Sequence, residues 1–121
     1  MSKYYSKKVT RDGITYDSIK EYKRHCELRL MEKAGVIKDL QRQVEFVLLP
    51  AQREPDRIGV RGGIIKGKTI EQAVKYVADF TYLEKGKLVV EDVKSPATRT
   101  RDYILKRKMA LYFLNIRIKE V

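Results

Sequence analysis

The 121-residue sequence has few of the side chains on which several common kinds of active site depend. Cys26 is the only cysteine and His25 is the only histidine. An internal disulfide is therefore impossible, and neither a structural zinc cluster nor a Ser-His-Asp or Cys-His catalytic site of ordinary spacing has the residues it needs. Any chemistry has to depend on carboxylates and lysines.

Long apolar runs are also missing. No segment approaches the roughly 18 consecutive apolar residues that a membrane-spanning helix needs, and the first ten residues, MSKYYSKKVT, contain no apolar stretch of the kind found in a secretion signal. We therefore expect a cytoplasmic protein without a membrane partner.

Acidic residues are outnumbered along the whole chain, with 16 Asp and Glu against 27 Lys and Arg, which gives a formal net charge of +11. A surface with this excess attracts polyanions, so we expect nucleic acid as the partner. The length and the 43% hydrophobic content fit one compact domain. We expect a basic N-terminal arm over residues 1–13 and a single domain over residues 14–121.

The helical segments are predicted from periodicity and capping residues. Ile19, Tyr22, Cys26 and Leu30 recur at helical spacing, so we expect a helix over residues 18–34 that is terminated by Gly35. A second helix is predicted after Pro96, with a threonine at position 98 or 100 as its cap, and it should end near residue 115.

The remaining segments predict strands and one polar loop. Residues 44–49 form a short apolar run, and the polar stretch 51–68 after Pro50 is expected to be a loop. Residues 75–83 and 87–94 are expected to form an antiparallel hairpin around the turn 84–86, and residues 116–121 a last strand. The result is an α/β fold with a central mixed sheet flanked by helices, in the order helix, three strands, helix, strand.

The hairpin carries the residues that are able to perform chemistry. Asp92 and Lys94 are two positions apart on one strand and share a face, and Asp79 reaches the same place if the register of the partner strand is compatible. Two adjacent carboxylates repel each other unless a cation lies between them, and oxygen ligands suit Mg²⁺ or Mn²⁺. Such an ion can polarise a phosphodiester and lower the pKa of a bound water, which the lysine would orient or deprotonate.

The pair Ala78-Asp79, followed by Asp92-Val93-Lys94, resembles the acid, spacer, acid-x-lysine signature of the PD-(D/E)XK nuclease superfamily, with Ala78 in place of the proline. The predicted order of elements over residues 18–121 is similar to the core of that superfamily. The segment Ser18-Ile19-Lys20-Glu21 resembles the serine-x-x-glutamate that opens the first helix of junction-resolving and transposon-end nucleases. The closest resemblance is to small phage-encoded, resolvase-like nucleases.

This resemblance implies a restriction-endonuclease-like core and a Mg²⁺-dependent DNA endonuclease, with Mn²⁺ able to substitute. Asp79, Asp92, the Val93 carbonyl and Glu21 would hold the metal, and Lys94 would position the attacking water. The resemblance further implies branched DNA such as Holliday junctions as substrate, a homodimer, and the cytoplasm of a bacterial host if the chain is phage-encoded. The alternatives are a nuclease for ordinary duplex or DNA ends, and a DNA-binding protein with a vestigial site.

Several patterns also have a structural interpretation. Glu21 can pair with Ser18 in a helix-capping box, and the hairpin charges can form an exposed salt-bridge ladder. Residues 62–69 match the phosphate-loop pattern, but a polar run precedes them and a strand is expected after them, so no nucleotide cofactor is expected. We expect DNA contacts from the basic loop residues Arg61, Lys66 and Lys68. We also expect them, rather than a solvated helix face, from Arg99, Arg101, Lys106 and Lys108.

Overall fold

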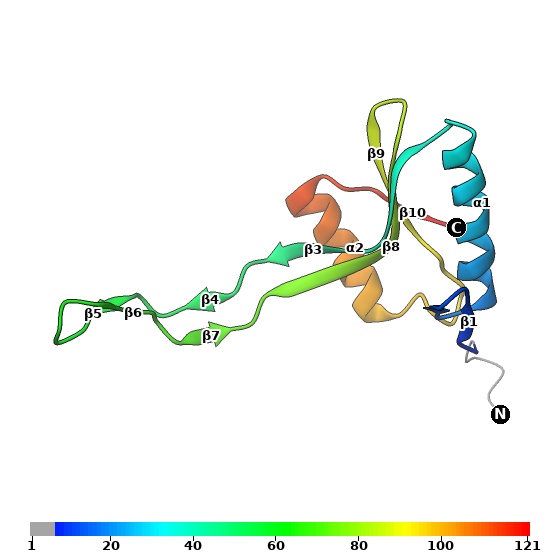
Figure 1. Ribbon diagram of the computed structural model, residues 1–121. Helices are drawn as coiled ribbons and strands as arrows, with labels where there is room; N and C mark the ends of the chain where they lie inside the picture. The colour runs from blue at the N-terminus through cyan, green and yellow to red at the C-terminus, as the bar shows by residue number, and fades with distance from the viewer. Residues whose placement is uncertain (1–6) are drawn as a thin grey trace.

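The computed structural model describes residues 7–121. A four-stranded sheet has the order β10-β9-β8-β3, formed by β3 (Lys38–Leu49), β8 (Val74–Glu84), β9 (Lys87–Asp92) and β10 (Ile118–Glu120). β9 and β10 are parallel, and the other neighbouring strands are antiparallel. Two helices accompany the sheet, and a long hairpin projects from it (Figure 1). The expected α/β fold with a mixed sheet is confirmed.

Both helices begin at a hydroxyl cap. α1 (Ile19–Lys33) follows Ser18, whose side chain accepts a hydrogen bond from the Glu21 N–H, and the chain leaves it through Gly35 at φ 81°. α2 (Arg101–Leu114) follows Thr100, whose side chain accepts from the Tyr103 N–H, and it ends at Asn115 in the left-handed region. These local caps explain why the helix ends were predictable from the sequence.

The two helices cover opposite faces of the sheet. Val90 of β9 packs in a core cluster with Tyr103 and Ala110 of α2. Its neighbour Val89 packs against a second cluster, which contains Leu28 of α1. Because consecutive residues of a strand point to opposite faces, these clusters form two separate layers of core, one under each helix.

Strand β8 changes faces at Asp79. Tyr76 and Ala78 pack in the α2 layer, whereas Phe80, which should share their face, packs in the α1 layer. The register that pairs Val44 with Ala78 continues to place Gln43 of β3 opposite Asp79, and Gln43 has φ 52°. β3 and β8 bend together here (Figure 1). Asp79 therefore lies at the boundary between the two core layers.

The projecting hairpin, which we call the arm, spans residues 50–73. Near its base, β4 (Gln52–Arg53) pairs with β7 (Thr69–Glu71), and farther out β5 (Arg57–Ile58) pairs with β6 (Ile64–Ile65). The sequence predicted a loop here, and the structure corrects this. The arm has no core beneath it, so its strands carry no apolar alternation that would reveal them. The phosphate-loop pattern of residues 62–69 lies in this arm, and β7 rather than a helix begins at its last residue, Thr69.

Both ends of the described chain are paired. β1 (Val9–Arg11) forms a small hairpin with β2 (Ile14–Tyr16), so part of the expected N-terminal arm is a strand, and residues 1–6 lie outside the described residues. At the other end, the Val121 N–H donates to the Asp92 carbonyl at 3.0 Å, and the Lys94 N–H donates to the Val121 carbonyl at 3.0 Å. No helix within residues 7–121 is long and apolar enough to cross a membrane.

Candidate active site

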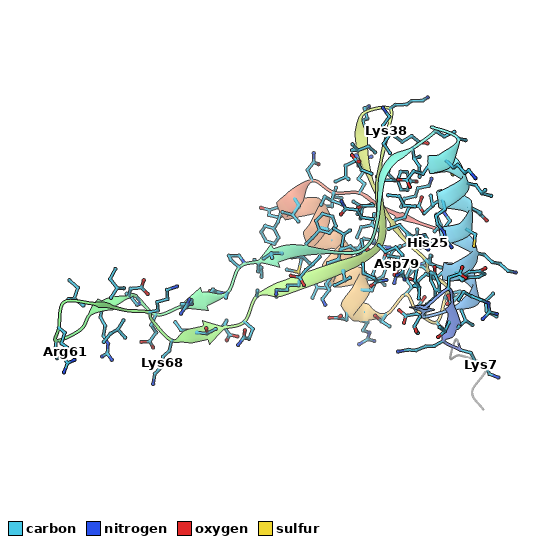
Figure 2. All side chains as sticks on the ribbon, in the orientation of Figure 1. Lys7, His25, Lys38, Arg61, Lys68 and Asp79 are labelled. Carbon is cyan, nitrogen blue, oxygen red and sulfur yellow. The ribbon has the colours of Figure 1, made fainter. Side chains whose placement is uncertain are left out.

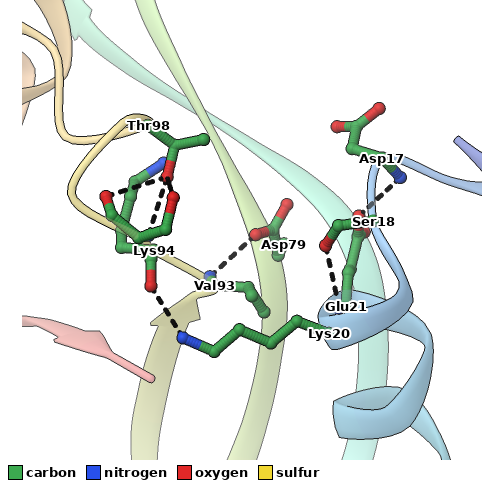
Figure 3. Close-up of a pocket in the computed structure, with 9 residues that line it drawn as sticks. Asp17, Ser18, Lys20, Glu21, Asp79, Val93, Lys94 and Thr98 are labelled. Carbon is green, nitrogen blue, oxygen red and sulfur yellow. Dashed lines mark hydrogen bonds between the residues drawn. The ribbon is translucent and has the colours of Figure 1, made fainter. Parts of the chain in front are cut away.

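Asp79 and Asp92 meet where β8 bends. The register that pairs Phe80 with Glu91 continues to place Asp79 opposite Asp92. Asp79 Oδ2 accepts a hydrogen bond of 2.8 Å from the Val93 N–H, which links the two strands immediately beyond Asp92 (Figure 3). The hairpin turn therefore produces the register that the sequence interpretation required.

Lys94 joins this acidic pair. Its Nζ lies 3.1 Å from Asp92 Oδ2 and 4.1 Å from the centroid of the Tyr103 ring, so the ammonium is held between a carboxylate and an aromatic face. Asp92 also accepts a hydrogen bond of 2.9 Å from the Tyr76 hydroxyl. The Asp92 and Lys94 side chains are only 4% and 14% exposed. An exposed salt-bridge ladder is therefore the wrong description of these residues.

Glu21 has both of the roles that its sequence context allowed. Its N–H donates to Ser18 Oγ at 3.1 Å, and its Oε2 accepts from the Asp17 N–H at 2.9 Å, which together cap α1. The side chain is nevertheless buried and its other oxygen faces the site, where Oε1 lies 3.2 Å from Gln43 Nε2 and 3.4 Å from Arg42 Nη2. The carboxylate that caps α1 therefore also lines the acidic site.

Gln43 connects the acids of the two elements. Its Nε2 donates to Glu21 Oε1 at 3.2 Å and to Asp79 Oδ1 at 3.4 Å. Neither Gln43 nor Tyr76 was identifiable from the sequence as a residue of the site. Gln43 precedes the apolar run used to predict β3. Tyr76 reaches Asp92 only because β8 changes faces at Asp79. The unusual backbone of Gln43 is a tertiary feature that no local pattern announces.

The surroundings of Asp79 disfavour the charged form of its carboxyl group. Burial, and then the hydrogen bond and charge of Asp92, raise the pKa of Asp79 to about 8, against the opposing effect of the Val93 N–H. Within residues 7–121, no three acidic, histidine or cysteine side chains are already arranged around a common metal position. The donor chemistry still fits a hard divalent cation, because such an ion would relieve the repulsion between Asp79 and Asp92 through oxygen ligands.

The acids are reached from two sides. On the α1 side, a pocket is lined by residues from the start of α1, from β8 and from the segment after β9, namely Asp17, Ser18, Lys20, Glu21, Asp79, Val93, Lys94, Ser95 and Thr98 (Figure 3). Lys20 crosses this pocket, where its Nζ donates to the Lys94 carbonyl at 2.7 Å. On the α2 side, a more open groove contains Gln43, Asp92 and Lys106.

The basic residues predicted to bind DNA fall into two groups. On α2, Lys106 lines the groove beside Asp92, 3.4 Å from Asp102, and the first residue of the helix, Arg101, is exposed, as is Lys108. Arg99 pairs with Glu120 at 2.9 Å. The other group lies on the arm, with Arg61 at its apex and Lys66 and Lys68 along its length, far from Asp79 (Figure 2).

Comparisons with known proteins give one match. The model of a family described as "Protein of unknown function (DUF1064)" matches residues 1–120, which is nearly the whole chain. No curated protein and no solved structure matches the sequence.

Proposed function

The chain belongs to the DUF1064 family, and we propose that it is a divalent-metal-dependent DNA endonuclease that hydrolyses phosphodiester bonds. The observation that carries this proposal is the convergence of Asp79, Asp92 and Lys94 in one largely buried site of a protein with a net charge of +11. Carboxylates that repel each other, a lysine beside them and a basic surface are the requirements of metal-assisted cleavage of a polyanion.

The fold supports the same proposal at a finer level. The core runs α1, β3, β8, β9, α2, β10, with the paired carboxylates on the hairpin of β8 and β9. This arrangement agrees with a restriction-endonuclease-like core of the PD-(D/E)XK superfamily, to which the sequence signature is similar. The small β1–β2 hairpin and the arm would be additions to that core.

We assign the following roles. Asp79, Asp92 and the Val93 carbonyl would hold Mg²⁺, or Mn²⁺ in its place, and Glu21 would complete the site. A divalent ion bound here supplies Lewis-acid polarisation of the phosphodiester and lowers the pKa of a bound water. Lys94 would orient that water, because its ammonium is fixed between Asp92 and the Tyr103 ring. Gln43 holds the carboxylates of Glu21 and Asp79 in fixed positions relative to each other through its two hydrogen bonds.

The proposal is tested by cleavage of a labelled four-way junction and a linear duplex of matched sequence, each with Mg²⁺, Mn²⁺ or a chelator. We expect cutting only with metal, and its loss in Lys94→Ala. Lys87→Ala removes the same charge from an exposed position at the start of β9 and is the matched control. Preference for the junction would support resolution of branched DNA, for which a two-fold homodimer is the simplest assembly.

Other outcomes separate the alternatives. Equal cutting of both substrates would make the chain a nuclease for ordinary duplex, and preference for duplex termini would make it an end nuclease. If neither substrate is cut under any metal condition while tight, salt-sensitive binding is retained, the chain is a DNA-binding protein with a vestigial site.

Asp92→Ala provides a sharper prediction. The substitution removes one of the two principal carboxylates, so we expect cleavage to fall at least about a thousandfold. Binding to DNA should be unchanged or tighter, because a negative charge leaves a phosphate-binding site. Binding is measured by fluorescence anisotropy in chelator. Cutting by this variant at the wild-type rate would contradict the assignment of the site.

A further inference from the structure

The tip of the arm exposes apolar side chains that contact little else. Its apex is a glycine-rich turn in which the Gly59 N–H donates to the Gly63 carbonyl at 2.7 Å. Val60 is fully exposed at 107%, and Ile58 and Ile64, which face each other across the β5–β6 pair, are 79% and 75% exposed. A cluster of this kind at the end of a projecting hairpin is unfavourable in water and marks a contact surface.

Positive charge surrounds this cluster. Arg57, Arg61, Lys66 and Lys68 are exposed, and within residues 7–121 none of them forms an ion pair. The acid nearest to them in sequence, Asp56, instead accepts a hydrogen bond of 2.8 Å from the Gly67 N–H, so it is used inside the arm. The ligand that fits should therefore have a negative exterior and an apolar interior.

Duplex DNA has this chemistry. Its phosphates complement the cations, its grooves admit a two-stranded β-ribbon, and apolar side chains at the ends of such elements insert between base steps and unstack them. A second copy of the chain is a poorer occupant, because tip-to-tip contact would bring two sets of unpaired cations together.

The length of the arm determines where this contact falls. Asp79 lies 15 positions after Ile64. At about 3.3 Å per residue, the tip lies up to roughly 50 Å from Asp79. Figure 2 shows Arg61 at the far end of the arm and Asp79 in the body of the protein. Since B-DNA rises about 3.4 Å per base pair, this distance corresponds to roughly 10 to 15 base pairs.

We propose that the arm grips duplex DNA, and that its apolar tip, formed by Ile58, Val60 and Ile64, inserts between base pairs about one helical turn or more from the bond at the active site. The identity of the partner rests on the proposed function, whereas the mode of gripping does not depend on cleavage. The duplex beside the cut site must then extend far enough for the tip to reach it.

The test uses the full chain in chelator, with labelled linear duplexes of about 8 to about 30 base pairs. We expect affinity to rise at least about tenfold between the shortest and the longest duplexes, with a step at the length the arm can span. A 2-aminopurine base is placed about 10 to 15 base pairs from the end of the duplex that lies at the active site. Its fluorescence should increase on binding, because unstacking relieves its quenching.

The tip variant carries Ile58→Ser, Val60→Ser and Ile64→Ser together. It should bind the shortest duplex like wild type but lose most of the length step and the 2-aminopurine signal. Leu30→Ser, which removes a 69% exposed leucine from α1, is the control and should behave like wild type. All of these side chains are exposed, so folding is preserved, and circular dichroism checks this directly.

Three outcomes would overturn the proposal. One is identical length dependence and fluorescence in wild type and the tip variant. A second is tip-dependent binding to vesicles containing phosphatidylserine without a length step on DNA, which would identify a lipid surface. A third is a dimer that dissociates only in the tip variant, which would identify a second copy. Because metal is absent throughout, this test does not depend on whether the protein cuts DNA. A protein that cuts DNA when metal is supplied but shows no length step would refute the proposal for the arm and leave the proposed nuclease function intact.

Discussion

Gln43 occupies a backbone conformation that glutamine seldom adopts, and it does so between two carboxylates. Its φ of 52° lies in the left-handed region, which costs a non-glycine residue roughly 1 kcal/mol. The strain places its amide within hydrogen-bond reach of both Glu21 and Asp79. The bend of β3 and the arrangement of the acids are therefore one structural feature.

Gln43→Asn should separate these two contributions. Asparagine tolerates the left-handed region but is one methylene too short to reach both acids. We expect kcat for metal-dependent cleavage to fall about tenfold, because a hydrogen bond to a charged group contributes roughly 1.5 kcal/mol. KM and thermal unfolding should change little. Gln41→Asn, an exposed position on the same strand, is the control, and equal rates for both variants would contradict a positioning role for Gln43.

His25 gives the protein a pH dependence of its own. It is buried, its Nδ1 lies 2.6 Å from the Tyr16 hydroxyl, and its ring stacks on Phe80. Burial, and then the charges of Arg29 and Arg42, lower the pKa of His25 to about 4. The unfolded chain takes up this proton near pH 6.5, whereas the folded protein resists it until about pH 4, so stability falls as the pH drops through this window.

Urea denaturation at pH 7 and pH 5 measures this effect. We expect the wild-type free energy of unfolding to fall by about 2 kcal/mol more than that of His25→Gln, since each unit of pKa shift corresponds to about 1.4 kcal/mol. The difference between the two proteins isolates His25 from the other titrating groups. Parallel losses in the two proteins would show that His25 is not the source.

At the scale of elements, the arm depends on the close approach of its two chains at Gly67. A Cβ added there would overlap the Glu54 carbonyl, and the Gly67 carbonyl accepts a hydrogen bond of 3.0 Å from Arg53 Nε. Neither side of the arm can move away from the other without breaking the backbone hydrogen bond from the Glu54 N–H to the Lys68 carbonyl. Glycine is required here for space, not for an unusual φ.

Gly67→Ala should therefore open the arm while leaving the sheet intact. We expect trypsin to cleave within residues 51–72 at least about tenfold faster, because local opening exposes Arg and Lys bonds to the protease. The melting temperature of the core should be nearly unchanged. Gly63→Ala, where an added Cβ meets nothing within 4 Å, is the control. Unchanged proteolysis in Gly67→Ala would show that the arm does not need this contact.

The elements that were predictable are those specified by local signals. Ser18 and Gly35 lie where the expected helix ends fall, and the turn at residues 85–86 lies within the expected turn 84–86, because capping and turn chemistry act over a few residues. β3 begins at Lys38 rather than near Val44. The first half of this strand was not predicted, because it is largely polar and shows no apolar run. The spacing of Asp79, Asp92 and Lys94 predicted their convergence, whereas the contacts of Gln43 and Tyr76 arise from the bend in β8, a tertiary feature.

At the scale of the whole molecule, the net charge of +11 would make affinity for DNA, the proposed partner, a function of salt. We expect duplex binding in chelator to weaken at least about a hundredfold between roughly 50 and 200 mM salt, because cations displaced from the phosphates are released into solution. Lys66→Ala with Lys68→Ala should reduce the slope of log affinity against log salt by about two. Lys33→Ala with Lys38→Ala, at the far end of α1 and the start of β3, is the control. An identical slope in all variants would place the arm outside the DNA interface.

The strand that carries Asp92 is completed by residues near position 121, since β10 lies alongside β9 and Val121 hydrogen-bonds on both sides of Val93. These residues are synthesised after β8, β9 and α2, because β10 follows all three in the chain. While they remain in the exit tunnel, β9 has a bare edge and the Asp92 carbonyl has no strand partner. The order of synthesis thus delays assembly of the acidic site until β10 has emerged and paired with β9.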